Sequence, residues 1–400
     1  MEGTRAPAGK RLLVLGAGPA QLGLLATARA RGLFVIAVDR DPSAPGFRLA
    51  DRRAIISTED ERRIERLAEA ERVDGLISPG TDWPVAIAAR VAEKLRLPHP
   101  IDGVTAALAT SKLKQRERLE AAGVPQPRWQ VVTERAADHP VPAVVKAPDR
   151  QGQKGLSLVR DPSGLGAAID TAVAESRSGV ALVEELVDGP EVTVNAFSVG
   201  GHFSELTVTD RLTADPPAFG VALAHVWPSE TGGSDEVLVV EKAARALGIA
   251  DGPTYTQLRI GPDGPQVVEL AARLGGGHDA ELCRAALGVD LNGLAISAAL
   301  GEHVDVPAPK AEVGGAVVRF LVPPEGELTA VAGIEEAKAQ DGVLDVRIYR
   351  EPGHVFGELR HGADRAGAVL AVGATREEAL ERADRAAALI RFEVGDRSLV

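Results

Sequence analysis

The stretch GAGPAQLG, residues 16–23, follows the apolar run at residues 12–15 and precedes a second apolar run that ends at Asp39. A glycine turn between a first strand and a first helix brings backbone N–H groups close to an anion. In a dinucleotide site, close packing of the helix against the strand favours a small residue where Gln21 stands, and the third glycine comes late, at Gly23. The turn therefore favours another small-molecule site, while a dinucleotide site and a purely structural turn stay open.

The rest of the N-terminal segment repeats this alternation of apolar runs and helical patterns, at residues 11–15, 21–31, 34–38, 59–70 and 75–78. Such alternation predicts a parallel sheet with helices on both faces. Ligands of these sheets bind at the carboxyl ends of the strands. The residues expected to line one crevice are therefore Gly16, Gly18, Asp39 and the turn 79–82, which ends at Asp82.

The composition describes a soluble globular chain of 400 residues, 45% hydrophobic and 26% charged, and its length suggests about two to four domains. A net charge of −12 argues against nucleic acid as a partner and favours small molecules. The single cysteine, Cys283, excludes an intrachain disulfide. No run approaches the ~20 apolar residues of a membrane span, and a polar leader precedes the first strand. We expect a cytoplasmic protein without a membrane partner.

The remaining chain is predicted to mix strands and helices. A helix at 111–122 ends at GVPQP, and strands at 142–146 and 156–159 flank the loop DRQGQKG. The further elements expected are a helix at 163–176, strands at 180–186 and 191–199, a hairpin at 255–260 and 265–270, strands at 315–321, 343–349 and 368–373, and a helix at 375–391.

Two lysines stand at distinctive positions. Lys112 opens a helix, and Lys146 ends the apolar strand AVVK directly before the glycine-containing loop. A lone lysine at a strand end is usually just solvated. A lysine beside a glycine-rich tip is also how proteins grip triphosphate oxygens, with the N–H groups of the tip closing over them. The residues that would supply this closure are Gly152, Gly155 and Ser157, with Lys154 as an extra charge.

Two further segments carry carboxylates. The segment VEELVDGPEVTV, residues 183–194, could be a solvated hairpin with no binding role. Alternatively, it could be a clamp that binds adenine and ribose. In VVELAARLGGGHD, residues 267–279, Glu269 ends a strand and is a reasonable Mg2+ ligand when phosphates supply other oxygens. Arg273, four residues later, can hold a carboxylate or acyl phosphate in bidentate fashion. For His278 two alternatives are equally open: it lies on the surface, or it contacts and positions the residues that bind the ligand.

Taken in order, these elements resemble the ATP-grasp superfamily, and within it the carboxylate–amine ligases related to purine-pathway enzymes, biotin carboxylase and carbamoyl phosphate synthetase. The resemblance covers essentially the whole chain and rests on five motifs. These are GAGPAQLG, TSKLKQRERLEAAGVPQP, VVKAPDRQGQKGLS, VEELVDGPEV and the closing AVGATREEALERADRAAALI. It implies an N-terminal Rossmann-like domain at 1–105, an ATP-grasp domain at 106–305 with a mobile lid at about 141–187, and a small α+β region at 306–400.

The resemblance also implies roles for individual residues, with ATP and Mg2+ as cofactors. Phosphates would be bound by Lys112 and Lys146, and the lid formed by Gly152, Gly155 and Ser157. Adenine would be held by Glu184, Glu185, Leu186 and Val187, and the ribose by Glu191. Magnesium would be bound by Glu269 and Gln257, and the reacting carboxyl group by Arg273. Catalysis would rest on Lys146 and Arg273. The substrate pocket would include Gly18, Asp82 and Gly276.

Two positions depart from the family pattern. Gln257, in TYTQLRI, stands where a metal-binding acid is usual, and Ala271 stands where the family has asparagine. An amide oxygen can still coordinate Mg2+, but the alanine side chain cannot. These departures leave open a non-catalytic ATP-binding protein.

The resulting prediction is an enzyme in which a carboxylate attacks the γ-phosphate of ATP and an amine then displaces phosphate from the acyl phosphate. Asp210, Arg211 and His225, the last in an expected loop, could recognise the charged ends of an amino acid. An amino-acid ligase is therefore the first prediction and a purine-pathway ligase the second, while a nicotinamide dehydrogenase leaves the lysine, loop and clamp unexplained. We expect the enzyme to act as a homodimer on a small-molecule carboxylate and an amine.

Overall fold

The computed structural model of the chain describes residues 9–134 and 139–395. Its N-terminal part is a four-stranded parallel sheet in the order β3-β2-β1-β4. The strands are β1 (Arg11–Leu15), β2 (Phe34–Asp39), β3 (Arg52–Ile55) and β4 (Gly75–Ile77), and the helices are α1 (Leu22–Ala30), α2 (Glu61–Glu71) and α3 (Asp82–Leu95). The predicted fold class, with a parallel N-terminal sheet, is confirmed.

Helices cover both faces of this sheet, because successive side chains of a buried parallel strand enter opposite cores. Leu12 and Val14 pack in one core with α1 and the distant α9 (Leu291–Ala299), and Leu13 and Leu15 pack in another with α2 and α3. The carboxyl ends of the strands are thereby left as the open edge of the sheet.

The centre of the molecule is an eight-stranded antiparallel sheet in the order β13-β12-β9-β10-β11-β14-β18-β16. It comprises β9 (Glu191–Val199), β10 (His202–Thr213), β11 (Ala222–Trp227), β12 (Gly252–Gly261), β13 (Gly264–Ala271), β14 (Gly315–Leu321), β16 (Val343–Ile348) and β18 (Gly367–Gly373). The helices beside it are α4 (Gly103–Ala109), α5 (Lys112–Ala121), α7 (Ser234–Ala246) and α8 (Asp279–Leu287). The segment that holds His225, expected to be a loop, is strand β11, which pairs with β10 and β14.

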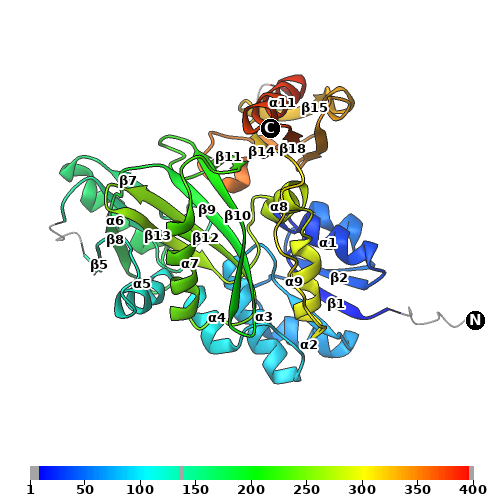
Figure 1. The fold of residues 1–400 in the computed structure, drawn as a ribbon, viewed down its shortest axis with the longest axis horizontal. Coiled ribbons are helices and arrows are strands. Elements are labelled where there is room, and N and C mark those ends of the chain that lie inside the picture. Colours follow the sequence, from blue (N-terminus) through cyan, green and yellow to red (C-terminus); the bar gives the residue numbers. More distant parts are fainter. Residues whose placement is uncertain (1–8, 135–138, 396–400) are drawn as a thin grey trace, which may run out of the picture.

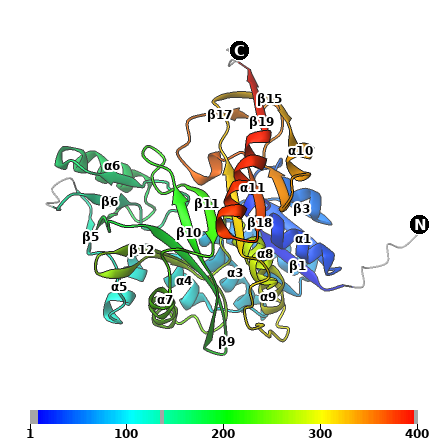
Figure 2. The same ribbon diagram turned by 45° about the horizontal axis from the view of Figure 1, so that its top comes forward.

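A smaller sheet in the order β5-β8-β6-β7 projects beside the central sheet and is covered by α6 (Leu165–Glu175). Its strands are β5 (Trp129–Val132), β6 (Ala143–Lys146), β7 (Ser157–Val159) and β8 (Ala181–Glu185). We call these four strands and α6 the lid, and residues 149–155 the lid loop. Figures 1 and 2 show the lid and the N-terminal sheet on opposite sides of the central sheet.

The C-terminal segment continues the central sheet, because β14 pairs with β11 on one side and with β18 on the other. The sheet therefore runs across residue 306, where the sequence suggests a boundary. Helix α11 (Arg376–Leu389) packs on β14 and β18. Beside it lie α10 (Ile334–Lys338) and a small sheet of β15 (Gly326–Ala332), β17 (Val355–Phe356) and β19 (Arg391–Gly395) (Figure 2).

Within residues 9–134 and 139–395, no single helix is long and apolar enough to cross a membrane. Helices α8 and α9 together reach the required length and apolar character, but the pair is bent by 120°.

Candidate functional site

A cavity of about 420 Å³ lies where the N-terminal turns, the lid, the central sheet and the C-terminal segment meet. Its wall carries many charged and polar side chains, which distinguishes it from an apolar core void. The predicted site residues that line it are Asp82, Lys112, Lys146, Gly152, Glu184, Glu185, Leu186, Val187, Glu191, Arg211, His225, Gln257, Glu269, Arg273 and Gly276.

Four of the predicted nucleotide and substrate residues do not line this cavity, and neither do Gly16 and Asp39 of the expected crevice. Gly18 precedes the lining residues Pro19, Ala20 and Gln21 in the N-terminal turn. A Cβ at Gly155 would lie 3.0 Å from those of Ala147 and Glu175, so this glycine, the last residue of the lid loop, is packed against them. Ser157 begins β7 and pairs with Val145.

The fourth residue, Asp210, was expected at the substrate site but does not line the cavity, and the geometry of its strand explains why. Neighbouring residues of a strand point to opposite faces, so Asp210 turns away from the face that Arg211 presents to the cavity. Its carboxylate instead accepts hydrogen bonds from Ser229 Oγ at 2.5 Å, Thr231 Oγ1 at 2.9 Å and Arg376 Nη2 at 2.6 Å. Asp210 thus fastens the C-terminal helix to the central sheet.

Each of the two predicted nucleotide lysines is paired with a carboxylate. Lys146 Nζ lies 2.7 Å from Glu184 Oε2, and both side chains are almost fully buried. Lys112 Nζ lies 2.7 Å from Glu269 Oε1 and donates to the carbonyl of Arg150 in the lid loop at 2.8 Å. A ligand with phosphate oxygens would compete with these carboxylates for the lysines.

Sequence reasoning missed Arg116, which is 1% exposed. Its Nε donates to Glu184 Oε1 at 2.7 Å, and its Nη1 and Nη2 donate to the carbonyls of Val267 and Val268 at 2.9 and 2.5 Å. Glu184 therefore keeps one cation when Lys146 turns toward a ligand. The signal was in the sequence, since Arg116 follows Lys112 by four residues and shares its helix face.

Lys146 gives the site a pH dependence. Burial lowers the pKa of Lys146 to about 8, against the raising effect of Glu184. Phosphate binding favours the protonated lysine, so we expect the apparent affinity for ATP to be constant below that value and to fall as pH rises through it, by up to about tenfold per unit. Titration of a fluorescent ATP analogue from pH 6 to 10 checks this. The Lys146→Arg variant, whose guanidinium does not titrate in that range, should lose the dependence.

The predicted metal ligands lie side by side, because Gln257 of β12 and Glu269 of β13 are register partners. Burial acts to raise the pKa of Glu269, but the Lys112 ammonium, together with Lys146 and Arg273, outweighs burial and lowers the pKa to about 2. The described part of the chain contains no group of three His, Cys, Asp or Glu side chains able to hold a metal alone. One carboxylate and one amide oxygen fit Mg2+, which typically takes its remaining ligands from phosphates and water.

The hairpin at residues 183–194, predicted to bind adenine and ribose, places Glu185 and Glu191 at the cavity wall. Each of these carboxylates pairs with a different arginine. Glu191 forms an ion pair with Arg211, whose Nη2 donates to the carbonyl of Gly220 at 2.8 Å. The side chain of Glu185 turns outward to Arg128, at 2.6 Å. The turn between the strands requires glycine, since Gly189 has φ of +152° and a Cβ there would lie 1.9 Å from the carbonyl oxygen of Ile260.

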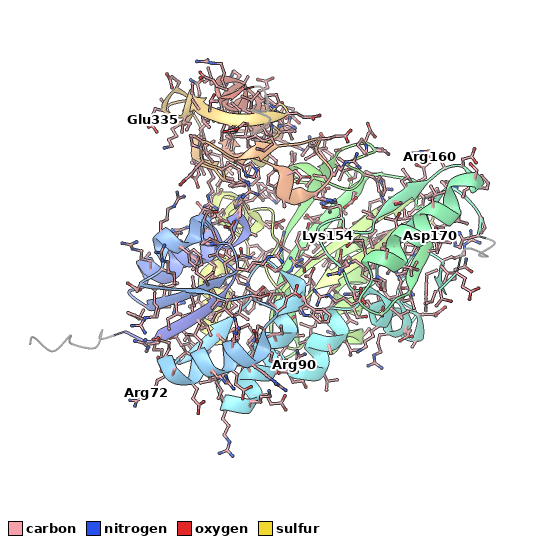
Figure 3. All side chains as sticks on the ribbon, turned by 180° about the vertical axis from the view of Figure 1, so that it is seen from behind. Arg72, Arg90, Lys154, Arg160, Asp170 and Glu335 are labelled. Carbon is pink, nitrogen blue, oxygen red and sulfur yellow. The ribbon has the colours of Figure 1, made fainter. Side chains whose placement is uncertain are left out.

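Three distant segments meet at Arg273. Its Nε lies 2.5 Å from Asp82 Oδ1 at the start of α3, and the backbone N–H of Asp82 donates to Gln151 Oε1 of the lid loop at 2.7 Å. The lid loop thus rests against the N-terminal part and closes one side of the cavity. In Figure 3, Lys154 of the loop lies near the middle of the molecule, whereas Arg160 and Asp170 lie on the outer lid.

His225 lies at the cavity wall and is uncharged at neutral pH. Burial lowers the pKa of His225 to about 4. Its Nδ1 lies 3.8 Å from Asp279 and has no hydrogen-bond partner within the described ranges. A Cβ at Gly277 would come within 2.6 Å of His225 Nε2, so the glycines of this turn leave room for the imidazole.

Comparison with known proteins gives relatives over nearly the whole chain. Residues 319–395 match the family described as L-amino acid ligase C-terminal domain 2. An uncharacterised protein, y4rH of Sinorhizobium fredii, is 32% identical over 332 residues, covering 78% of this chain and 67% of y4rH. The formate-dependent phosphoribosylglycinamide formyltransferase of Burkholderia cenocepacia is 27% identical over 417 residues, 96% of each chain.

Among solved structures, the L-amino acid ligase from Bacillus licheniformis superposes with a TM-score of 0.82 at 22% identity, over 97% of this chain and 99% of that one. At this level of identity the match establishes a shared fold.

Proposed function

We propose that this chain, which belongs to the same family as y4rH of Sinorhizobium fredii, is an ATP-grasp enzyme. It would be an ATP-dependent ligase that joins the carboxyl group of a small molecule, first of all an amino acid, to an amine. The observation that carries the proposal is the convergence of Lys112, Lys146, Glu269 and Arg273 on one cavity, from three separate segments: α5, β6, and β13 with the turn that follows it. The reaction consumes ATP and releases ADP and phosphate.

The proposed chemistry has two steps. The substrate carboxylate attacks the γ-phosphate of ATP to give an acyl phosphate and ADP, and the amine then attacks the acyl carbon and displaces phosphate. Lys112 and Lys146 bind phosphate oxygens, and Arg273 holds the reacting carboxylate in position. The closed lid loop excludes water, which would hydrolyse the acyl phosphate. Mg2+, held by Glu269 and Gln257 together with phosphate oxygens, would neutralise charge on those oxygens.

The first test is release of ADP and phosphate from Mg-ATP with a panel of amino acids, offered singly and in pairs. We expect release that requires one carboxylate compound and increases with a particular amine, with the amide product identified by mass spectrometry. Tight ATP binding without ADP release from any pair would contradict an amino-acid ligase.

A purine-type ligase is the second candidate, favoured by the match to the Burkholderia formyltransferase over 96% of both chains. It predicts that a phosphorylated ribosyl amine, and not an amino acid, stimulates ADP release. Including such an amine in the same panel decides between the two candidates.

A non-catalytic ATP-binding protein is favoured by Gln257 and Ala271, since Ala271 offers no ligand atom and is 2% exposed. We expect the Gln257→Glu variant to bind Mg2+ more tightly, by roughly tenfold, because a second carboxylate then faces the site beside Glu269. The measurement is the Mg2+ concentration that half-saturates ADP release or nucleotide binding. Unchanged Mg2+ dependence would remove Gln257 from the metal site.

Two further expectations stay predictions. A homodimer would show twice the chain mass of 41.7 kDa in light scattering. A cytoplasmic protein would appear in the cytosolic fraction of its cells.

A further inference from the structure

The lid touches the N-terminal part of the chain at a second place, which lies outside the central cavity. Arg177 belongs to the short segment 176–178, directly after α6. Its Nη2 lies 2.7 Å from Oε1 of Glu59, in the loop between β3 and α2. The guanidinium also lies over the ring of Trp83 in α3, with Cζ 3.9 Å from the ring centroid. We call Arg177, Glu59 and Trp83 the latch.

The latch is connected to the lid loop by hydrogen bonds. Asp149, the first residue of the lid loop, accepts the backbone N–H groups of Arg177 at 2.9 Å and of Ser178 at 2.7 Å. The next residue, Arg150, donates from Nε to the carbonyl of Glu175 at the end of α6. These bonds join the segment that carries Arg177 to the start of the lid loop. Releasing Arg177 from the N-terminal part therefore loosens the lid loop as well.

The latch stands beside a second cavity, of about 220 Å³, between the lid loop and the N-terminal part. All three latch residues line this cavity, and so do Lys112 and Glu269 of the proposed reaction site. The side chains of Arg177 and Glu59 are 24% and 48% exposed, whereas those of Lys112 and Glu269 are 14% and 23% exposed. The second cavity thus leads from the solvent, at the latch, to the residues proposed to hold the phosphate and the metal.

We infer that the latch holds the lid closed over this second cavity and thereby keeps water away from the acyl phosphate. This inference rests on the proposed function. Water that attacks the acyl phosphate regenerates the carboxylate and releases phosphate, so that one ATP is consumed and no amide bond forms. An open lid would admit water to the intermediate by way of Lys112 and Glu269. The latch thus couples the consumption of ATP to the formation of the amide.

The strength of the latch suits a lid that has to reopen in every turnover. Its two contacts, an ion pair and a cation–π contact, both involve side chains that are partly exposed to water, and such contacts are individually weak. Together they favour the closed lid by roughly threefold to tenfold. The lid is therefore closed for most of the time, and product release still needs only these weak contacts to break.

The first test measures lid opening by hydrogen–deuterium exchange, with no nucleotide or substrate present. The backbone N–H groups of Asp82 and Trp83 donate to Gln151 Oε1 of the lid loop at 2.7 and 3.3 Å, so both lose their partner when the loop lifts. We expect these two amides to exchange roughly threefold to tenfold faster in Arg177→Ala than in the parent protein. Glu59→Gln should have a smaller effect, because the contact of Arg177 with Trp83 remains.

The double variant and a matched control complete this test. Combining Glu59→Gln with Arg177→Ala should open the lid no further than Arg177→Ala alone, because both changes remove the same ion pair. Arg160→Ala removes an exposed arginine of the outer lid (Figure 3) and should leave the exchange unchanged. Parent-like exchange at Asp82 and Trp83 in Arg177→Ala would show that the latch does not hold the lid.

The second test compares the amounts of ADP and amide formed from the pair of substrates that the panel identifies. We expect equal amounts in the parent enzyme and in Arg160→Ala, and an excess of ADP in Arg177→Ala. With the carboxylate alone, ADP release by Arg177→Ala should exceed that of the parent enzyme by roughly threefold to tenfold, in proportion to lid opening. If the lid opens in Arg177→Ala and ADP still equals amide, the latch does not protect the intermediate and the inference is overturned.

The two tests also separate this inference from the proposed function. If no pair of substrates elicits ADP, the proposed function fails by itself, and the exchange at Asp82 and Trp83 still decides whether the latch holds the lid. Should Arg177→Ala not fold, Glu59→Gln gives the same comparison from the N-terminal side of the contact, and parent-like exchange together with equal ADP and amide in that variant would count against the latch.

Discussion

Replacing Lys146 with alanine is expected to lower turnover roughly a hundredfold or more, about 3 kcal/mol of transition-state stabilisation. The ammonium of Lys146 is 5% exposed and lies at the cavity. In such a dry site a fixed positive charge stabilises phosphate oxygens far more than it would in water. The measurement is kcat for ADP release at saturating Mg-ATP.

The fold of the Lys146→Ala variant should survive, because Glu184 retains its 2.7 Å contact with Arg116. Thermal unfolding and circular dichroism check this. Lys338→Ala, which removes a half-exposed lysine paired with Glu335, is the matched control and should keep full activity. Turnover within a factor of two of the parent enzyme in Lys146→Ala would show that this lysine does not act on the phosphate.

The N-terminal fold could be predicted from the sequence because its signals are local. In β1 the run from Leu12 to Leu15 is buried on both faces, and such continuous apolar runs mark parallel strands. Strand β10 carries no comparable signal. The segment from His202 to Thr213 mixes threonine, serine and charged residues, and its strand character depends on pairing with β9 and β11. That pairing comes from tertiary contacts, which a single sequence does not display.

The sequence allowed us to predict most of the residues that line the cavity. It did not allow us to predict which of them form ion pairs with one another. Lys146, Glu269 and Arg273 stand at strand ends or just beyond, where the fold class places ligands. The partner Arg116 was missed because it acts through contacts with a segment remote in the chain, at Val267. Asp210 lies away from the cavity for a simpler reason, since a strand sends adjacent side chains to opposite faces.

Replacing Glu269 with glutamine should also lower turnover roughly a hundredfold, and should raise the Mg2+ concentration needed for half-maximal activity. The site described by the structure has one carboxylate, Glu269, beside the amide of Gln257. A second glutamine would leave both predicted metal ligands uncharged. Because Glu269 also pairs with Lys112 at 2.7 Å, a loss of activity alone would not separate the metal from the lysine.

The Mg2+ titration provides that separation. If Glu269 acts by holding Mg2+, the Glu269→Gln variant should recover part of its turnover at high Mg2+, and Glu269→Asp, which keeps the charge, should need less Mg2+ than Glu269→Gln. If Glu269 acts only by placing Lys112, whose second partner is the Arg150 carbonyl, the Mg2+ dependence should match that of the parent enzyme and the defect should lie in the KM for ATP. An unshifted Mg2+ titration in Glu269→Gln therefore argues against Glu269 as a metal ligand, even if turnover falls.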